Sequence, residues 1–151
     1  MLRKIVNTDN DFTLTVLRLV LGVIFLCHGG QKVLGWFGGN TLGASMKMFT
    51  EGMHIPAPLA FLAIMAEFAG GLGLIVGLLG RIAAFGIIAN MVVAIFMVHS
   101  KFGLFMNWFG NQQGEGYEYH LLAIAIGLAI LVRGCGALSI DRALSSSPRA
   151  Q

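Results

Sequence analysis

Long apolar segments separated by short polar ones dominate the pattern of the 151-residue chain. A helix that crosses the hydrocarbon core of a bilayer needs about 20 mostly apolar residues. Four segments meet this requirement, at approximately residues 12–34, 58–79, 82–100 and 117–133. Their apolar residues run on without the alternation that is typical of a membrane barrel strand. The pattern therefore predicts an all-α polytopic membrane protein, a bundle of four transmembrane helices.

The connections between the predicted helices differ in length. Residues 80–81 join the second and third helices in a tight hairpin, whereas residues 35–57 and 101–116 form two longer loops at the opposite, outer end of the bundle. A chain of this length holds one domain. We expect a single membrane domain over residues 1–142, followed by a polar C-terminal tail at 143–151.

Composition narrows the class of protein further. Charged residues make up 11% of the chain and apolar residues 56%, where a soluble domain carries roughly a quarter charged residues. The net charge of +3 is too small for a nucleic-acid-binding surface. Two cysteines are too few for a disulfide framework. The methionines and histidines of the outer side fit no fixed ligand spacing, so no metal site is expected.

Lysine and arginine residues are unevenly divided between the two ends of the predicted bundle. The end that holds both termini has six of them, and the outer end has three. Because cytoplasmic loops are the richer in these residues, both termini are expected in the cytoplasm. The six are Arg3, Lys4, Arg81, Arg133, Arg142 and Arg149, and the three are Lys32, Lys47 and Lys101.

Glu67 is the most informative polar residue within the apolar segments. It lies about nine residues into the second predicted helix, roughly 13 Å along the axis. A carboxylate at that depth costs a few kcal/mol unless it is paired or protonated. We therefore expect it to contact a basic or histidine side chain of another helix, namely Lys32, His28 or His99. Its role is either to handle a proton or ligand, or to lock two helices together.

Further polar residues collect in the same outer half of the predicted bundle. His28, Gln31 and Lys32 share one face of the first helix because of their i, i+3, i+4 spacing. His99 lies near the outer end of the third helix, and Glu118 opens the fourth. Their convergence from separate helices favours a functional site in the outer half.

A structural interpretation stays open for each of these side chains. Lys32 can extend its charge to the membrane surface, as long side chains near helix ends do. His28 can form a hydrogen bond between helices, and His99 and His120 can be solvated at the interface.

The inner half of the predicted bundle holds few polar residues, mainly Arg18 and Asn90. Arg18 either extends its long stem toward the cytoplasm, pairs with a carboxylate, or binds an oxygen of a lipid or a quinone. Gly73 and Gly77 form a GxxxG pattern, which is typical of close packing between membrane helices.

Five motifs extend over nearly all of residues 12–142: RLVLGVIFLCHGGQKVLGWFGG, AEFAGGLGLIVGLLGR, MVVAIFMVHSKFG, EYHLLAIAIGLAIL and GALSID. Together they resemble the DoxX family of small four-helix bacterial membrane proteins. The insertion NWFGNQQGEG before Glu118 departs from the family pattern. The residues on the family's motif positions are Arg18, Gly22, His28, Gly29, Lys32, Glu67, Gly70, Gly71, Arg81, His99, Glu118 and Tyr119.

The resemblance implies a location in the bacterial inner membrane and an association with quinone-linked redox complexes. Some relatives are subunits of thiosulfate:quinone oxidoreductases, which need partner subunits. The implied ligand is a quinone near Glu67, His28 and Lys32. No flavin, haem or iron–sulfur motif is found in the sequence, so catalysis by this chain alone is not expected. A protein partner or a second copy of the chain is implied instead.

Three functions stay open from the sequence. The chain is a redox-complex subunit with a quinone site, a structural or assembly subunit without a ligand, or a small-solute transporter. Four short helices give a narrow pore, which disfavours the transporter. The candidate residues for ligand binding or proton handling are Glu67, His28, Lys32, His99, Glu118, Arg18, Gln31 and Tyr119.

Overall fold

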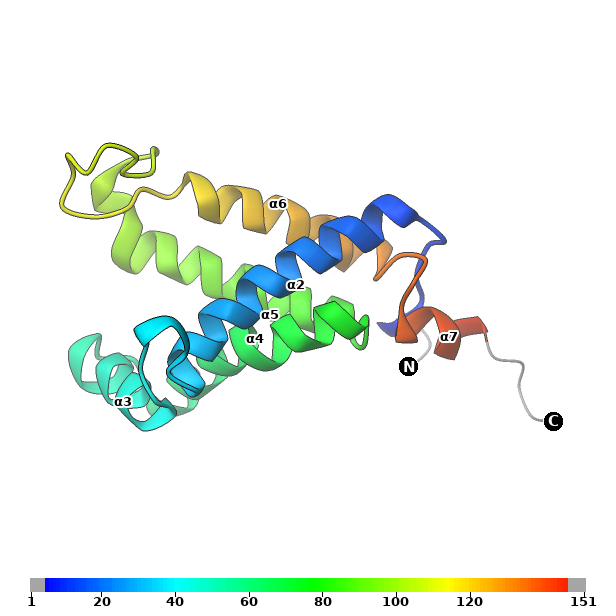
Figure 1. The fold of residues 1–151 in the computed structure, drawn as a ribbon, viewed down its shortest axis with the longest axis horizontal. Coiled ribbons are helices and arrows are strands. Elements are labelled where there is room, and N and C mark those ends of the chain that lie inside the picture. The colour runs from blue at the N-terminus through cyan, green and yellow to red at the C-terminus, as the bar shows by residue number, and fades with distance from the viewer. Residues whose placement is uncertain (1–4, 147–151) are drawn as a thin grey trace.

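The structure of the protein is a computed structural model that describes residues 5–146. Four long helices form its body (Figure 1), and strand-like pairing among the described residues is limited to one bridge between Leu34 and Thr41. The predicted all-α class is therefore confirmed. Three residues used to predict the topology, Arg3, Lys4 and Arg149, lie outside the described residues, as do residues 147–151 of the predicted tail.

The long helices lie close to the predicted segments. They are α2 (Phe12–Val33), α4 (Ala57–Val76), α5 (Gly80–Ala94) and α6 (Glu118–Arg133). The short turns η3 (Ile95–His99) and η4 (Ser100–Phe102) continue α5 toward the loop that follows it. The predicted loop at 35–57 is more ordered than expected, because it contains η1 (Trp36–Gly38), α3 (Leu42–Lys47) and η2 (Met48–Gly52).

Three of these helices are long and apolar enough to cross a membrane: Phe12–Val33, Ala57–Val76 and Gly80–Phe102. α6 has 16 residues. At 1.5 Å per residue it is about 24 Å long, shorter than a hydrocarbon core of about 30 Å. A crossing by α6 would need the chain before or after it to complete the distance.

Close backbone contact joins α2 to α4. A Cβ atom at Gly29 would lie 2.4 Å from the backbone of Phe68, and one at Gly71 would lie 2.4 Å from the Leu26 nitrogen. Only glycine fits at such positions, as in other membrane helix pairs. The predicted GxxxG contact is wrong, because Gly77 ends α4 in the left-handed conformation at φ 71°.

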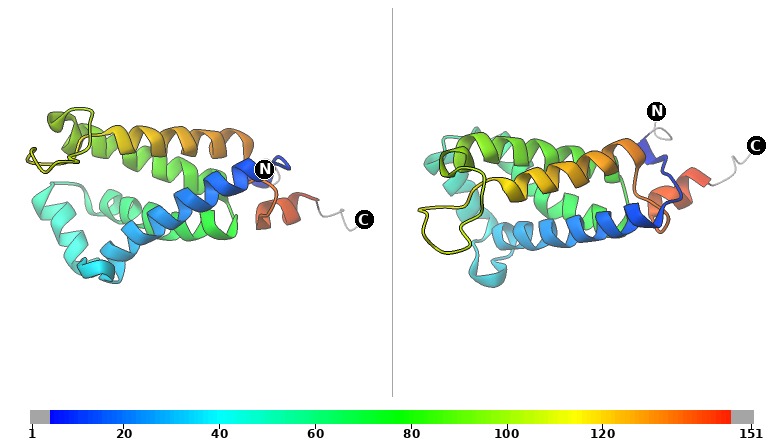
Figure 2. Two further views of the ribbon diagram at one scale, coloured as in Figure 1. Left: turned by 45° about the horizontal axis from the view of Figure 1, so that its top comes forward. Right: turned by 90° about the horizontal axis from the view of Figure 1, so that it is seen from above.

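Each long helix packs on the next, α2 on α4, α4 on α5 and α5 on α6, and the contact between α2 and α6 is the smallest. The turn at residues 77–79 joins α4 to α5. α2 and α6 lie close together at one end and farther apart at the other (Figures 1 and 2). We call the end where α2 and α6 lie close together the terminal end. It holds residues 5–11, the 77–79 turn and α7 (Ile140–Ser146). The other is the loop end, which holds residues 34–56 and 95–118. Between them lies an apolar core of Leu21, Phe25, Leu74, Ala84, Ile87, Met91, Ala123 and Ile130.

Candidate functional site

Glu67 of α4 lies at the centre of a polar network in the loop-end half of the bundle. Its side chain is buried, and its Oε2 atom lies 2.5 Å from the Nζ atom of Lys32 on α2. The predicted contact between Glu67 and a basic side chain of another helix is therefore present. The partly buried ammonium group of Lys32 also lies 3.5 Å from the carbonyl oxygen of His28.

Asn90 of α5 forms a second hydrogen bond to Glu67. Its amide nitrogen donates to Glu67 Oε1 at 2.9 Å and lies 3.4 Å from the carbonyl oxygen of Ala63. The assignment of Asn90 to the inner half of the bundle is therefore wrong. The length of the hairpin could have predicted this contact. Glu67 and Asn90 are nearly the same number of residues from Leu78, so a tight antiparallel hairpin places them at the same depth.

His28 lies at the edge of the network, between α2 and α6. Its ring centroid is 6.2 Å from that of Tyr119 on α6 and 6.3 Å from that of Phe25. His28 is exposed at the protein surface. Thus the network reaches the outside of the protein on the side where α2 and α6 separate.

A pair of histidine rings, tilted 45° to each other, continues the network toward the loop end. The rings of His99 and His120 have centroids 4.1 Å apart, and His120 is also 5.5 Å from Tyr119. His99 Nδ1 lies 2.7 Å from the carbonyl oxygen of Glu115. His120 is 6% exposed, so its predicted solvation at the interface is wrong. Its place on the inward face of α6 explains the burial.

Two buried polar atoms of the network have no hydrogen-bond partner among the described residues. They are the hydroxyl oxygen of Tyr119 and Nδ1 of His120. Leaving a buried donor unpaired costs about 1–3 kcal/mol, so native proteins rarely do so without a reason such as a bound ligand or water. Both atoms belong to α6, and both side chains contact a histidine of another element.

Glu118 is not part of this network. Its Oε1 atom accepts hydrogen bonds from the backbone nitrogen of Met106 at 3.0 Å and from the indole nitrogen of Trp108 at 2.9 Å. The carboxylate therefore fixes the loop that precedes α6. The sequence placed Glu118 at the correct end of the bundle but did not show that it faces the loop.

Arg18 lies far from the network, at the terminal end, and it is fully buried rather than extended toward water. Its guanidinium group donates to backbone carbonyl oxygens at the end of α4 and in the segment before α7. The acceptors are Leu74, Ile75 at 2.7 Å, Cys135 at 2.9 Å and Leu138 at 2.6 Å. The predicted extension of Arg18 toward the cytoplasm is wrong, because the side chain is buried and donates to four backbone carbonyl oxygens.

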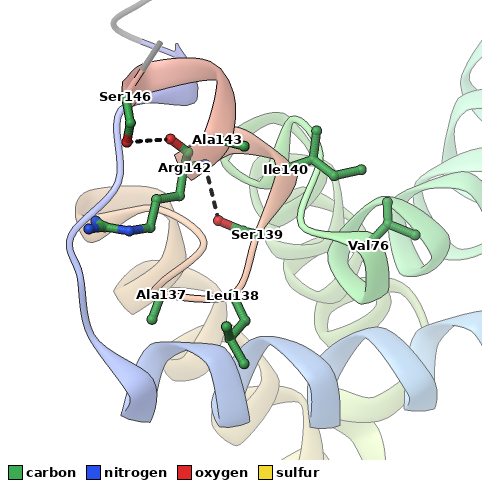
Figure 3. A pocket seen from close by; sticks show the side chains of 8 residues that line it. All are labelled: Val76, Ala137, Leu138, Ser139, Ile140, Arg142, Ala143 and Ser146. Atoms are coloured by element: carbon green, nitrogen blue, oxygen red, sulfur yellow. Dashed lines mark hydrogen bonds between the residues drawn. The ribbon is translucent and has the colours of Figure 1, made fainter.

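The terminal end also carries an open surface depression of about 600 Å³ beside α7 (Figure 3). Ser139 and Ser146 bond to the backbone of Arg142 there, and Val76, Leu138 and Ile140 supply apolar side chains. The depression lies at the opposite end from the polar network. No group of three or more metal-binding side chains occurs in the described part of the chain.

The side chains at the loop end can bind a group that accepts hydrogen bonds, and they can exchange protons. Tyr119 and His120 offer unpaired polar atoms, while Glu67, Lys32 and His28 are titratable. All four long helices contribute, because Asn90 lies on α5. An apolar ligand with polar oxygens is the class of molecule that such a site fits.

Comparison with known proteins shows the family of the chain. The DoxX family profile matches residues 13–100. The chain is 29% identical over 136 residues to the protein called "Inner membrane protein YqjF" of Escherichia coli strain K12, covering 89% of this chain and 94% of that protein. It is 31% identical to an uncharacterized protein of Haemophilus influenzae, over 86% of this chain and 89% of the relative. No solved structure is significantly similar to it. Matching the family profile over more than half of its length, the chain belongs to the DoxX family.

Proposed function

We propose that the protein is a subunit of a quinone-linked redox system and binds a quinone head group at the loop-end network. The observation that carries the proposal is the pair of buried, unpaired polar atoms on Tyr119 and His120. The two carbonyl oxygens of a quinone accept hydrogen bonds, which would satisfy these groups. Exposure of His28 between α2 and α6 supports an approach from the lipid side.

A bound quinone supplies two-electron, two-proton redox chemistry, and the chain's own residues supply the rest. The Tyr119 hydroxyl and His120 imidazole orient the head group. The Glu67–Lys32 pair, with His28 beside it, holds protons within reach of the same region. Electrons come from a partner protein, with which this chain or a second copy of it associates.

We further propose that the chain lies in the bacterial inner membrane with four crossings and both termini in the cytoplasm. The similarity to an inner membrane protein supports the location. The distribution of lysine and arginine supports the orientation of the termini. A reporter enzyme that is active only in the periplasm, fused after Gln151, should then be silent. An active fusion would place the histidine-rich loop end on the cytoplasmic side.

Binding of a short-chain quinone analogue to the purified protein tests the proposed site. Tyr119→Phe removes the unpaired hydroxyl and should weaken binding about tenfold, since one hydrogen bond is worth roughly 1–1.5 kcal/mol. Tyr117→Phe is the matched control, because Tyr117 precedes α6 outside the network. Equal affinity of wild-type protein and Tyr119→Phe, measured by equilibrium dialysis, would rule out this site.

A structural role for the network is the second candidate, because both carboxylate oxygens of Glu67 are bonded without any ligand. Glu67→Gln keeps the shape and removes the charge, whereas Glu67→Leu removes both polarity and shape. If the network is only structural, the Glu67→Gln protein should still complement a strain that lacks the wild-type protein, and Glu67→Leu should fail to assemble. If it handles protons, Glu67→Gln should assemble but lose the redox phenotype.

A further inference from the structure

The loop between η4 and α6 presents aromatic side chains that no other part of residues 5–146 covers. Phe105, Trp108 and Phe109 are 66%, 77% and 89% exposed. The sequence from Phe102 to Gly114 contains no charged residue. We call residues 103–116 the aromatic loop. An exposed, uncharged cluster of three aromatic side chains marks a surface that is covered in the functional state of a protein.

The aromatic loop is held in one conformation by side chains at its base. Besides the two bonds from Met106 and Trp108 to Glu118, the backbone nitrogen of Asn107 donates to Glu115 Oε2 at 2.6 Å. The base is closed by backbone bonds from residues 117–118 to residues 103–104. The aromatic side chains are thus presented outward by a fixed loop, rather than being left outside by disorder.

Many polar groups of the loop are satisfied within the loop itself. The side chain of Asn107 bonds to both backbone groups of Gln112, at 2.9 and 3.0 Å, and the nitrogen of Gly110 donates to the Asn107 carbonyl. The indole nitrogen of Trp108, usually the polar part of that side chain, is already bonded to Glu118. Internal pairing of this kind lowers the cost of moving backbone into an apolar environment.

Exposed apolar residues of the helices flank the aromatic loop on both sides in the chain. Phe96 in η3 is exposed just before the loop, and Leu121 and Leu122 of α6 are exposed just after it. Those helix faces are the ones that lipid covers in a membrane protein. Trp and other aromatic side chains favour the boundary between headgroups and acyl chains.

We propose that the aromatic loop inserts Phe105, Trp108 and Phe109 into the interfacial region of the lipid leaflet at the loop end. Glu118 is the positioning residue that holds the loop in the inserting conformation. The partner of this surface is lipid rather than a soluble protein, because the three aromatic side chains lie in a segment without charge, residues 102–114, and exposed apolar helix residues flank that segment in the chain. The proposal does not depend on quinone binding.

The two tryptophans of the chain make the test direct. Trp36→Phe leaves Trp108 as the only tryptophan, and Trp108→Phe leaves Trp36. Trp36 is the control, since its ring packs against Gly30 of α2 and it is 41% exposed. Each protein is reconstituted into phosphatidylcholine vesicles whose acyl chains carry bromine near the headgroup end or near the chain terminus. Tryptophan fluorescence is then measured with each lipid and with aqueous iodide.

In the Trp36→Phe protein, the lipid brominated near the headgroup should quench Trp108 most strongly, and iodide should quench it weakly. Quenching of Trp108 by iodide without quenching by either lipid would overturn the proposal and leave the loop free for a soluble partner. Glu118→Ala in the same background should lose most of the lipid quenching while helicity is unchanged. Glu51→Ala, which alters an exposed pair with Lys47 at the same end, should leave it unchanged. Undiminished quenching in a folded Glu118→Ala protein would overturn the role of Glu118.

Discussion

The two ends of the bundle use polar side chains in opposite ways. At the terminal end, Arg18 and Arg81 donate to backbone carbonyl oxygens of the segments that they join. At the loop end, Glu67, Lys32 and Asn90 bond chiefly to one another, and Tyr119 and His120 keep unpaired atoms. Backbone acceptors cannot change protonation, so the bonds of Arg18 and Arg81 form a fixed frame at the terminal end. The loop end is the part of the bundle where binding or proton transfer can change the pairing.

The terminal end is also closed by Asp141. Its two carboxylate oxygens accept from the backbone nitrogens of Leu79 and Gly80, at 2.8 and 3.0 Å, where α5 begins. The Cys135 thiol donates to the same carboxylate at 3.2 Å. Burial first, and this hydrogen bond second, raise the pKa of Cys135 to about 12. The sequence did not single out Asp141, whose motif GALSID is otherwise polar only at Ser139.

The largest effect is expected from Arg18→Met. Loss of the guanidinium leaves four carbonyl oxygens without their donor, two of them in buried residues, which should lower the free energy of unfolding in detergent by about 3 kcal/mol or more. Arg142→Gln, in a partly buried residue of α7, is the control and should change it little. A mild effect of Arg18→Met would mean that the terminal end is not the frame of the bundle.

Glu67→Leu should have the next largest effect, a loss of about 2 kcal/mol, because Lys32 and Asn90 lose their shared partner. Adding Lys32→Met should restore much of the stability, since replacing both members of a buried pair is often nearly neutral. Denaturant unfolding of the two variants measures the difference. No recovery in the double variant would show that the Glu67–Lys32 pair is as necessary for stability as the bonds of Arg18. The contrast between the loop end and the terminal end would then be wrong.

Asp141→Ala should cost about 1 kcal/mol, the usual loss for a helix cap. It should also speed alkylation of Cys135, because the carboxylate that disfavours the thiolate is gone. Labelling rates of the folded protein at mildly alkaline pH provide the measurement, with Cys27→Ser as background so that Cys135 is the only thiol. An unchanged rate would show that burial alone protects Cys135.

The smallest effect concerns the exposed pairs of Arg133 with Asp9 and Asp11, at 2.7 and 3.2 Å. Burial tends to raise the pKa of Asp11, but hydrogen bonds from Thr13 and Leu14 and the charge of Arg133 lower it overall. A lowered pKa in the folded state stabilises the fold above the ordinary value of 3.8, and this contribution is lost as pH falls through the lowered value. Arg133→Gln should weaken the acid-side dependence of the melting temperature slightly, most visibly at low salt. An equal pH dependence of the melting temperature in the wild-type and Arg133→Gln proteins would show that Arg133 does not lower the pKa of Asp11.

The sequence by itself determined the helices, because apolar length is a local property. The ranges 12–34 and 117–133 match α2 and α6 within a residue at each end. It also determined that Glu67 needs a partner, since a lone carboxylate is costly at that depth. It could not identify α3, which lies inside a glycine-rich segment.

Only the tertiary structure decided which side chains meet. Depth along a helix follows from the rise per residue, but facing depends on how each helix is rotated about its axis. That rotation is fixed by contacts such as Gly29 with Phe68, which turn Lys32 toward Glu67. The hairpin at 77–79 sets the register that brings Asn90 to the same carboxylate. Arg18 meets backbone carbonyls, rather than a charged partner, because α4 ends beside it, and no local pattern encodes where a distant helix ends.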